Sequence, residues 1–109
     1  MELTQDTLTL SACTAVVDGA YAGRDDFRRL VLPEGIITIG NEAFTGCTAL
    51  EEVILPDTLT TIGAAAFAGC ERLSNIELPA ALLIIGEGAF LDCTALHRIN
   101  LPQGLQAIE

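Results

Sequence analysis

Cysteine is the residue type in this sequence with the widest chemical range, because a thiolate can act as a nucleophile, a redox centre or a metal ligand. Cys47, Cys70 and Cys93 are spaced 23 residues apart, and Cys13 lies outside that spacing. No two cysteines form the Cys-x-x-Cys spacing that is typical of zinc sites and redox pairs. The sequence therefore favours the simpler interpretation, in which the repeated cysteines are small buried hydrophobic residues.

One histidine and one acidic pair are the other candidates for chemistry. His97 is the single histidine of the chain, and it has no nucleophile or carboxylate at a recognisable catalytic spacing. Asp25 and Asp26 are oxygen ligands of the kind that calcium prefers, but they lack the frame of an EF-hand loop. A solvated loop is the more common setting for such a pair. The sequence thus predicts no enzymatic activity, no metal site and no cofactor.

An internal repeat of 23 residues must position all of these side chains. A degenerate first copy places Val16 in the isoleucine column and Tyr21 in the phenylalanine column, while Arg24 stands in the cysteine column. The repeated positions are Pro33, Pro56, Pro79 and Pro102; Gly40, Gly63 and Gly86; Phe44, Phe67 and Phe90; Leu50, Leu73 and Leu96; and Ile39, Ile62, Ile85 and Ile108.

Each copy opens with a segment that has the alternation of a strand. In the segment Leu73-Ser-Asn-Ile76-Glu-Leu78, the spacing of two between Ile76 and Leu78 indicates a strand with one buried face. Pro79 has no N–H to donate to a neighbouring strand, so the strand is expected to end there.

The second half of each copy is expected to return the chain to the next strand. Ile85 begins another buried, extended contact on the opposite side of the coil, and Gly86 turns the chain with a backbone angle that favours glycine. Ala89 and Phe90 then turn inward in a short helical or 3₁₀ piece. One such coil cannot bury its own apolar edge, so the coils are expected to stack, with equivalent side chains in columns.

This pattern resembles the leucine-rich-repeat proteins of the BspA-like class, and it does so through units such as LPDTLTTIGAAAFAGCERL at 55–73. The resemblance extends from about Val16 to Ile108. It implies an α/β repeat solenoid: a right-handed coil with a parallel concave sheet, short strands, and 3₁₀ or helical turns on the convex side. Members of this class are typically bacterial surface or secreted proteins with roles in adhesion or host contact. No catalytic residue belongs to the family pattern.

The repeat predicts two regions in one domain. Residues 1–15 are interpreted as N-terminal capping strands, and residues 16–109 as an array of about four copies with the last one incomplete. Solenoid ends need polar caps. We therefore expect the chain to be a piece of a longer array or a unit that self-associates through its C-terminal edge.

Composition excludes several classes of partner. Fifteen acidic residues against five arginines give a net charge of −10, which disfavours nucleic acid and anionic membrane surfaces. No apolar run is long enough to span a membrane, and the N-terminus lacks the features of a signal peptide. Location is left open, with a cell-surface or secreted protein implied by the resemblance.

The exposed face of the predicted concave sheet is the candidate binding site. Its positions vary from copy to copy while the core positions repeat, which is typical of a binding surface and also of a tolerant solvent face. We expect the partner to be a protein or peptide. The candidate residues are Arg29, Val31, Glu52, Ile54, Asn75, Glu77, Arg98 and Asn100.

Overall fold

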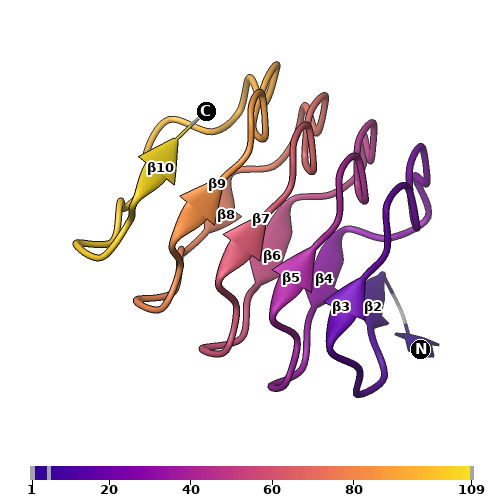
Figure 1. The fold of residues 1–109 in the computed structure, drawn as a ribbon. Coiled ribbons are helices and arrows are strands. Elements are labelled where there is room, and N and C mark those ends of the chain that lie inside the picture. The colour runs from indigo at the N-terminus through magenta and orange to yellow at the C-terminus, as the bar shows by residue number, and fades with distance from the viewer. Residues whose placement is uncertain (1, 5, 109) are drawn as a thin grey trace.

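The computed structural model, which describes residues 2–4 and 6–108, is a stack of coils with two five-stranded sheets on opposite sides (Figure 1). Sheet A contains, in spatial order, β1 (Glu2–Thr4), β2 (Thr7–Thr9), β4 (Arg29–Val31), β6 (Glu52–Ile54) and β8 (Asn75–Ile76). Sheet B contains β3 (Ala15–Val16), β5 (Thr38–Ile39), β7 (Thr61–Ile62), β9 (Ile84–Ile85) and β10 (Ala107–Ile108).

The repeat sets the register of both sheets. In sheet A, Arg29 lies opposite Glu52 and Glu52 opposite Asn75. In sheet B, Thr61 lies between Thr38 and Ile84. These partners are 23 residues apart and the strands run parallel, so the predicted parallel sheet and the predicted second extended contact are both confirmed. Among the described strands, only β1 pairs antiparallel, with β2.

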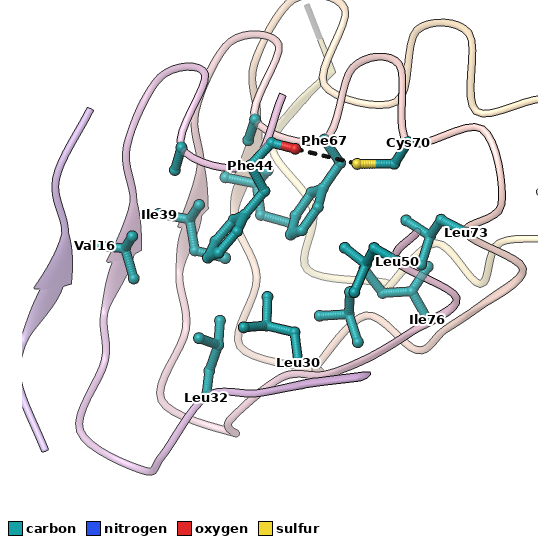
Figure 2. Packing of buried hydrophobic residues seen from close by; sticks show 14 of the residues in the cluster. Val16, Leu30, Leu32, Ile39, Phe44, Leu50, Phe67, Cys70, Leu73 and Ile76 are labelled. Atoms are coloured by element: carbon teal, nitrogen blue, oxygen red, sulfur yellow. Dashed lines mark hydrogen bonds between the residues drawn. The ribbon is translucent and has the colours of Figure 1, made fainter. Parts of the chain in front are cut away.

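The core is a set of side-chain columns, as the repeat predicts. Figure 2 shows Phe44 and Phe67 side by side between the two sheets. The rings of Tyr21, Phe44, Phe67 and Phe90 form a continuous stack, with centroid distances of 5.4, 5.4 and 5.7 Å and nearly parallel planes. Phe44 and Phe67 are fully buried. Each of these rings therefore packs against the equivalent ring of a neighbouring coil.

The segments that connect sheet B to sheet A are series of turns. The expected 3₁₀ or helical pieces are not confirmed, because the described residues contain no helix. Left-handed backbone recurs at two columns in each of these segments, and this breaks any helical run before a second turn can form. One column is Gly19, Glu42, Ala65 and Gly88, and the other is Gly23, Gly46, Gly69 and Asp92.

The glycine column that follows sheet B has a different role from the one expected. Gly40, Gly63 and Gly86 do not adopt positive φ. A Cβ on Gly63 would lie 2.7 Å from the backbone nitrogen of Asn41, in the preceding coil. These glycines are therefore required by the close approach of neighbouring coils, and the prediction of an unusual backbone angle there is wrong.

The N-terminal strands extend sheet A only. β2 pairs with β4 in parallel and β1 closes that edge, so the predicted short strands exist. Their role as a cap for residues 1–15 stays a prediction, as does the array at 16–109; Met1, Gln5 and Glu109 lie outside the described residues. In the described part of the chain, sheet B ends at β3, beside an apolar hollow of about 240 Å³ that includes Val16 and Tyr21.

Candidate interaction surface

The outer face of sheet A is built by strict alternation along its strands. Leu30, Val53 and Ile76 point inward and are buried, so their chain neighbours must point outward. The outward neighbours are Arg29 and Val31 on β4, Glu52 and Ile54 on β6, and Asn75 on β8. The structure thus brings five of the eight candidate residues onto one face.

The polar row of this face is a hydrogen-bonded ladder. Arg29 Nε donates to Glu52 Oε1 at 2.7 Å, and Asn75 Nδ2 donates to Glu52 Oε2 at 3.0 Å. Both carboxylate oxygens of Glu52 are therefore engaged within the protein. Such exposed pairs add little to stability, but they fix the orientation of three side chains that a partner would meet.

A parallel ion-paired row lies where the strands begin. Arg28 Nη1 is 3.3 Å from Asp6 Oδ2, and Arg28 Nε is 3.6 Å from Glu51 Oε2. Each arginine at the N-terminal end of sheet A thus has acidic neighbours on adjacent coils. The positive charge of this region is neutralised locally.

The apolar part of the face opens into a groove. Val31 lies beside Ile54 in the register of β4 and β6, and the Ile54 side chain is 41% exposed. A groove of about 380 Å³ lies at the ends of β6 and β8, with Ile54, Asp57, Asn75, Glu77 and Ala80 among its lining residues. We call it the sheet-A groove. Glu77, which follows β8, reaches this groove although it is outside the strand.

Two candidate residues lie off the sheet. Arg98 and Asn100 belong to a fourth copy that forms no strand at this position. Asn100 uses its side chain instead: its Oδ1 accepts from the backbone N–H of Leu78, and its Nδ2 donates to the Leu78 carbonyl, both at 2.9 Å. The amide occupies the hydrogen-bonding position that the next strand would take, so Arg98 and Asn100 lie beyond the last strand of sheet A. Their part in a binding face stays a prediction.

The repeated cysteines have a structural role that sequence reasoning only partly anticipated. They are buried, as predicted, and each thiol also donates a hydrogen bond to a carbonyl in the preceding coil (Figure 2 shows the bond of Cys70). These bonds join Cys47 to Tyr21 at 3.3 Å, Cys70 to Phe44 at 3.2 Å and Cys93 to Phe67 at 3.0 Å. The donor and the acceptor are 26 residues apart in each of these three bonds. The sequence offers no other sign of the contact.

The environment keeps the Cys70 and Cys93 thiols protonated, whereas the hydrogen bond with Cys70 lowers the pKa of Cys47, which is fully buried. The neighbouring Cys47 thiol, together with burial, raises the pKa of Cys70, and burial raises the pKa of Cys93. Since the thiolate is the reactive form, neither group is activated as a nucleophile. Cys13 differs from the others because it is exposed.

The remaining candidates for chemistry are dispersed. Asp26 is bound by the Arg24 guanidinium, whose Nε donates to Oδ1 at 3.0 Å, and this hydrogen bond lowers the pKa of Asp26. His97 is exposed. Within residues 2–4 and 6–108, no three histidine, cysteine or acidic side chains gather in the way that a metal site requires.

Sequence reasoning missed one large feature, the outer face of sheet B. Its strands carry the outward residues Thr38, Thr61 and Ile84. The signal was present as threonine and aliphatic residues recurring just before the repeated isoleucines. It was overlooked because only one concave sheet was expected to present variable positions.

Comparison with known proteins agrees with the geometry. Residues 14–109 match the model of the "BspA type Leucine rich repeat region" in 6 copies. The fold is similar to a leucine-rich repeat protein of Treponema pallidum, with 31% identity and a TM-score of 0.88 over 92% of this chain and 50% of that one. A Bacteroides ovatus leucine-rich repeat protein is 41% identical, with a TM-score of 0.70 over 73% of this chain and 21% of that one.

A leucine-rich cell surface protein of Faecalibacterium prausnitzii has the same fold, with 24% identity and a TM-score of 0.88 over 93% of this chain and 27% of that one. This chain therefore spans half of the Treponema protein and about a quarter of the Faecalibacterium protein. No curated protein matches the sequence. Among the described residues there is no helix suited to crossing a membrane. The family model covers nearly the whole chain, so the chain belongs to the BspA-type leucine-rich repeat proteins.

Proposed function

We propose that the chain is a protein-interaction module that binds a protein or peptide through the outer face of sheet A. The observation that carries the proposal is the contrast between the two sides of each strand. The inward residues are repeated and buried, whereas the outward residues differ from coil to coil and are held in fixed orientations by the Arg29–Glu52–Asn75 ladder. Preorganised side chains reduce the entropy that a partner must offset on binding.

The composition of this face suits a protein ligand. It combines an exposed apolar residue, Ile54, with charged and amide groups and the sheet-A groove. Interfaces between proteins mix an apolar centre with a polar rim in this way. We propose that the module has no catalytic role, because the repeated thiols are buried in the core and the other reactive groups of the described residues are dispersed.

We further propose a place on the bacterial cell surface, with adhesion or host contact as the role. One structural neighbour is described as a cell surface protein, and another as a pneumococcal vaccine antigen. Both are much longer than this chain, which spans 27% and 30% of them. The module would then supply one part of a longer binding surface.

A capture experiment with a matched pair of variants tests the use of sheet A. Ile54→Glu places a charge on sheet A, and Ile84→Glu makes the same change on sheet B, at residues that are 41% and 37% exposed. Each immobilised variant and the native chain would be offered a panel of purified host matrix and surface proteins. We expect a ligand that the native chain and Ile84→Glu retain and Ile54→Glu loses.

Retention of the ligand by Ile54→Glu would overturn the proposal for sheet A. Loss by Ile84→Glu alone would move the binding site to the opposite sheet. Circular dichroism melts of both variants are the control, since each substituted side chain is on the surface and is expected to leave the fold intact.

The second candidate function is a structural unit that associates end to end. It is favoured by the apolar residues exposed near the C-terminal coil, where Leu91 and Leu101 are 61% and 57% exposed. Contact between coil ends would continue the stacking that builds the solenoid. A Leu101→Glu variant whose mass in solution no longer depends on concentration would support this candidate, and an unchanged dependence would contradict it.

A further inference from the structure

The first coil departs from the cysteine column at position 24. Cys47, Cys70 and Cys93 are buried, and each donates a hydrogen bond to a carbonyl of the preceding coil. The corresponding residue of the first copy is Arg24. A guanidinium is always charged and is almost never fully buried without a partner. Arg24 therefore needs contacts of a different kind, and these contacts lie on the core of the first coil.

The Arg24 guanidinium lies over two aromatic rings of the first coil. Its Cζ atom is 5.7 Å from the centroid of the Tyr21 ring and 5.6 Å from that of the Phe27 ring. Tyr21 is the first ring of the stack and packs against Phe44 at a centroid distance of 5.4 Å, while Phe27 is only 1% exposed. A guanidinium within about 6 Å of a ring centroid is attracted to the ring. Arg24 therefore joins two columns of the core at the first coil.

Asp26 holds the guanidinium in this position. Arg24 Nε donates to Asp26 Oδ1 at 3.0 Å, and Arg24 Nη2 donates to Asp26 Oδ2. Both side chains are partly exposed, so the charge of the pair adds little to stability on its own. Two parallel bonds also fix the plane of a guanidinium, which a single bond does not do. The ion pair therefore orients Arg24 over the rings of Tyr21 and Phe27.

The turn that carries Arg24 is bonded to the cysteine of the second coil through one shared carbonyl. The Tyr21 carbonyl accepts from the backbone N–H of Arg24 at 3.2 Å and from Cys47 Sγ at 3.3 Å. The neighbouring Gly23 N–H donates to the Thr45 carbonyl at 2.7 Å and ties the same turn to the second coil. A displacement of the Arg24 turn would therefore move the acceptor of the Cys47 thiol and expose the sulfur to solvent.

We infer that Arg24 and Asp26 form a latch that holds the turn of the first coil closed over the Cys47 thiol. Each coil of a solenoid contacts only its neighbours, so the first coil can open while the coils beyond it stay stacked. Release of the latch therefore exposes Cys47 and leaves Cys93 buried. Lysine keeps the charge of Arg24 but cannot form the two parallel bonds. This inference is independent of the proposed function, which uses sheet A.

Labelling of the whole chain with a small disulfide reagent, with each modified cysteine located by mass spectrometry, tests the inference. We expect Arg24→Ala to raise the labelling rate of Cys47 by about tenfold, because the ring contacts and the ion pair are lost together, and to leave the rate of Cys93 unchanged. Arg24→Lys and Asp26→Asn should raise the Cys47 rate less. Removing a positive charge disfavours a thiolate, so faster labelling reports opening of the coil. Arg72→Ala removes an exposed arginine from a later coil and is the matched control.

Three results would overturn the inference. Native labelling rates at Cys47 in both Arg24→Ala and Asp26→Asn would show that the pair does not hold the coil closed. An equal rise at Cys47 and Cys93 would show that the substitutions lower the stability of the whole stack. A rise at Cys47 in Arg72→Ala as large as that in Arg24→Ala would assign the effect to net charge. Asp26→Asn keeps Arg24 and both rings, so the latch stays testable even where Arg24→Ala does not fold.

Discussion

At the scale of single residues, the repeated cysteines both pack in the core and form hydrogen bonds between coils. Each thiol fills space in the core and joins its coil to a carbonyl of the preceding coil. The sequence predicted burial from the regular spacing, since a repeated position in a solenoid faces the core. It did not predict the sulfur–carbonyl bonds, because these depend on how far one coil is displaced from the next.

Thiol accessibility separates the four cysteines. Cys70 and Cys93 are buried and have raised pKa values. Both thiols therefore stay protonated at pH values at which a free cysteine already forms the reactive thiolate. Labelling of the native protein with a disulfide reagent at neutral pH should modify Cys13 rapidly and the buried cysteines only as fast as the protein unfolds. Rapid labelling of Cys47, Cys70 or Cys93 would contradict the buried column.

The phenylalanine column should carry a large share of the stability. Phe67 is fully buried between the rings of Phe44 and Phe90. Phe67→Ala opens a cavity between two occupied coils and should lower the free energy of unfolding by roughly 3–5 kcal/mol. Phe44→Ala should have a similar effect. Urea melts of both variants provide the measurement, and a neutral result for either would refute the ring stack.

At the scale of elements, two residues that are two positions apart have opposite backbone requirements. Gly63 has ordinary φ but no room for a Cβ, while Ala65 adopts φ of 55°. The repeat indicated that glycine mattered near this turn, and the structure shows that contact between coils is the reason. Left-handed backbone at Ala65 could not be predicted from the sequence, because only Gly19 and Gly88 of the same column are residues that favour this conformation.

A pair of glycine exchanges tests this distinction. Gly63→Ala pushes a methyl group into the backbone of the coil below and should destabilise by about 1–3 kcal/mol. Ala65→Gly relieves an unfavourable left-handed alanine, worth about 1–2 kcal/mol, but adds about 0.4–1 kcal/mol of entropy to the unfolded chain. It should therefore be neutral to slightly stabilising. Thermal melts that rank the two variants in the reverse order would contradict the assignment.

At the scale of the whole molecule, the predicted columns and parallel strands agree with the structure because both follow from one 23-residue period. The end of sheet A could not be predicted this way. His97 to Asn100 carry the spacing of a strand, yet Asn100 turns its side-chain amide to Leu78 and the ladder stops. The 23-residue period describes only what neighbouring coils share, so it does not predict how the last copy differs from the others.

The two sheets also divide the surface by charge. Sheet A carries an ion-paired and amide-bearing face with a groove, and sheet B carries a neutral one. The central claim is that a protein ligand binds the outer face of sheet A and not that of sheet B. Because the faces lie on opposite sides of the core, substitutions on them should act independently.

The most direct test applies Ile54→Glu and Ile84→Glu to the ligand-capture assay. We predict that Ile54→Glu loses the ligand and that Ile84→Glu keeps it. Retention of the ligand by Ile54→Glu, or its loss by a folded Ile84→Glu variant, would contradict the assignment of the ligand to sheet A.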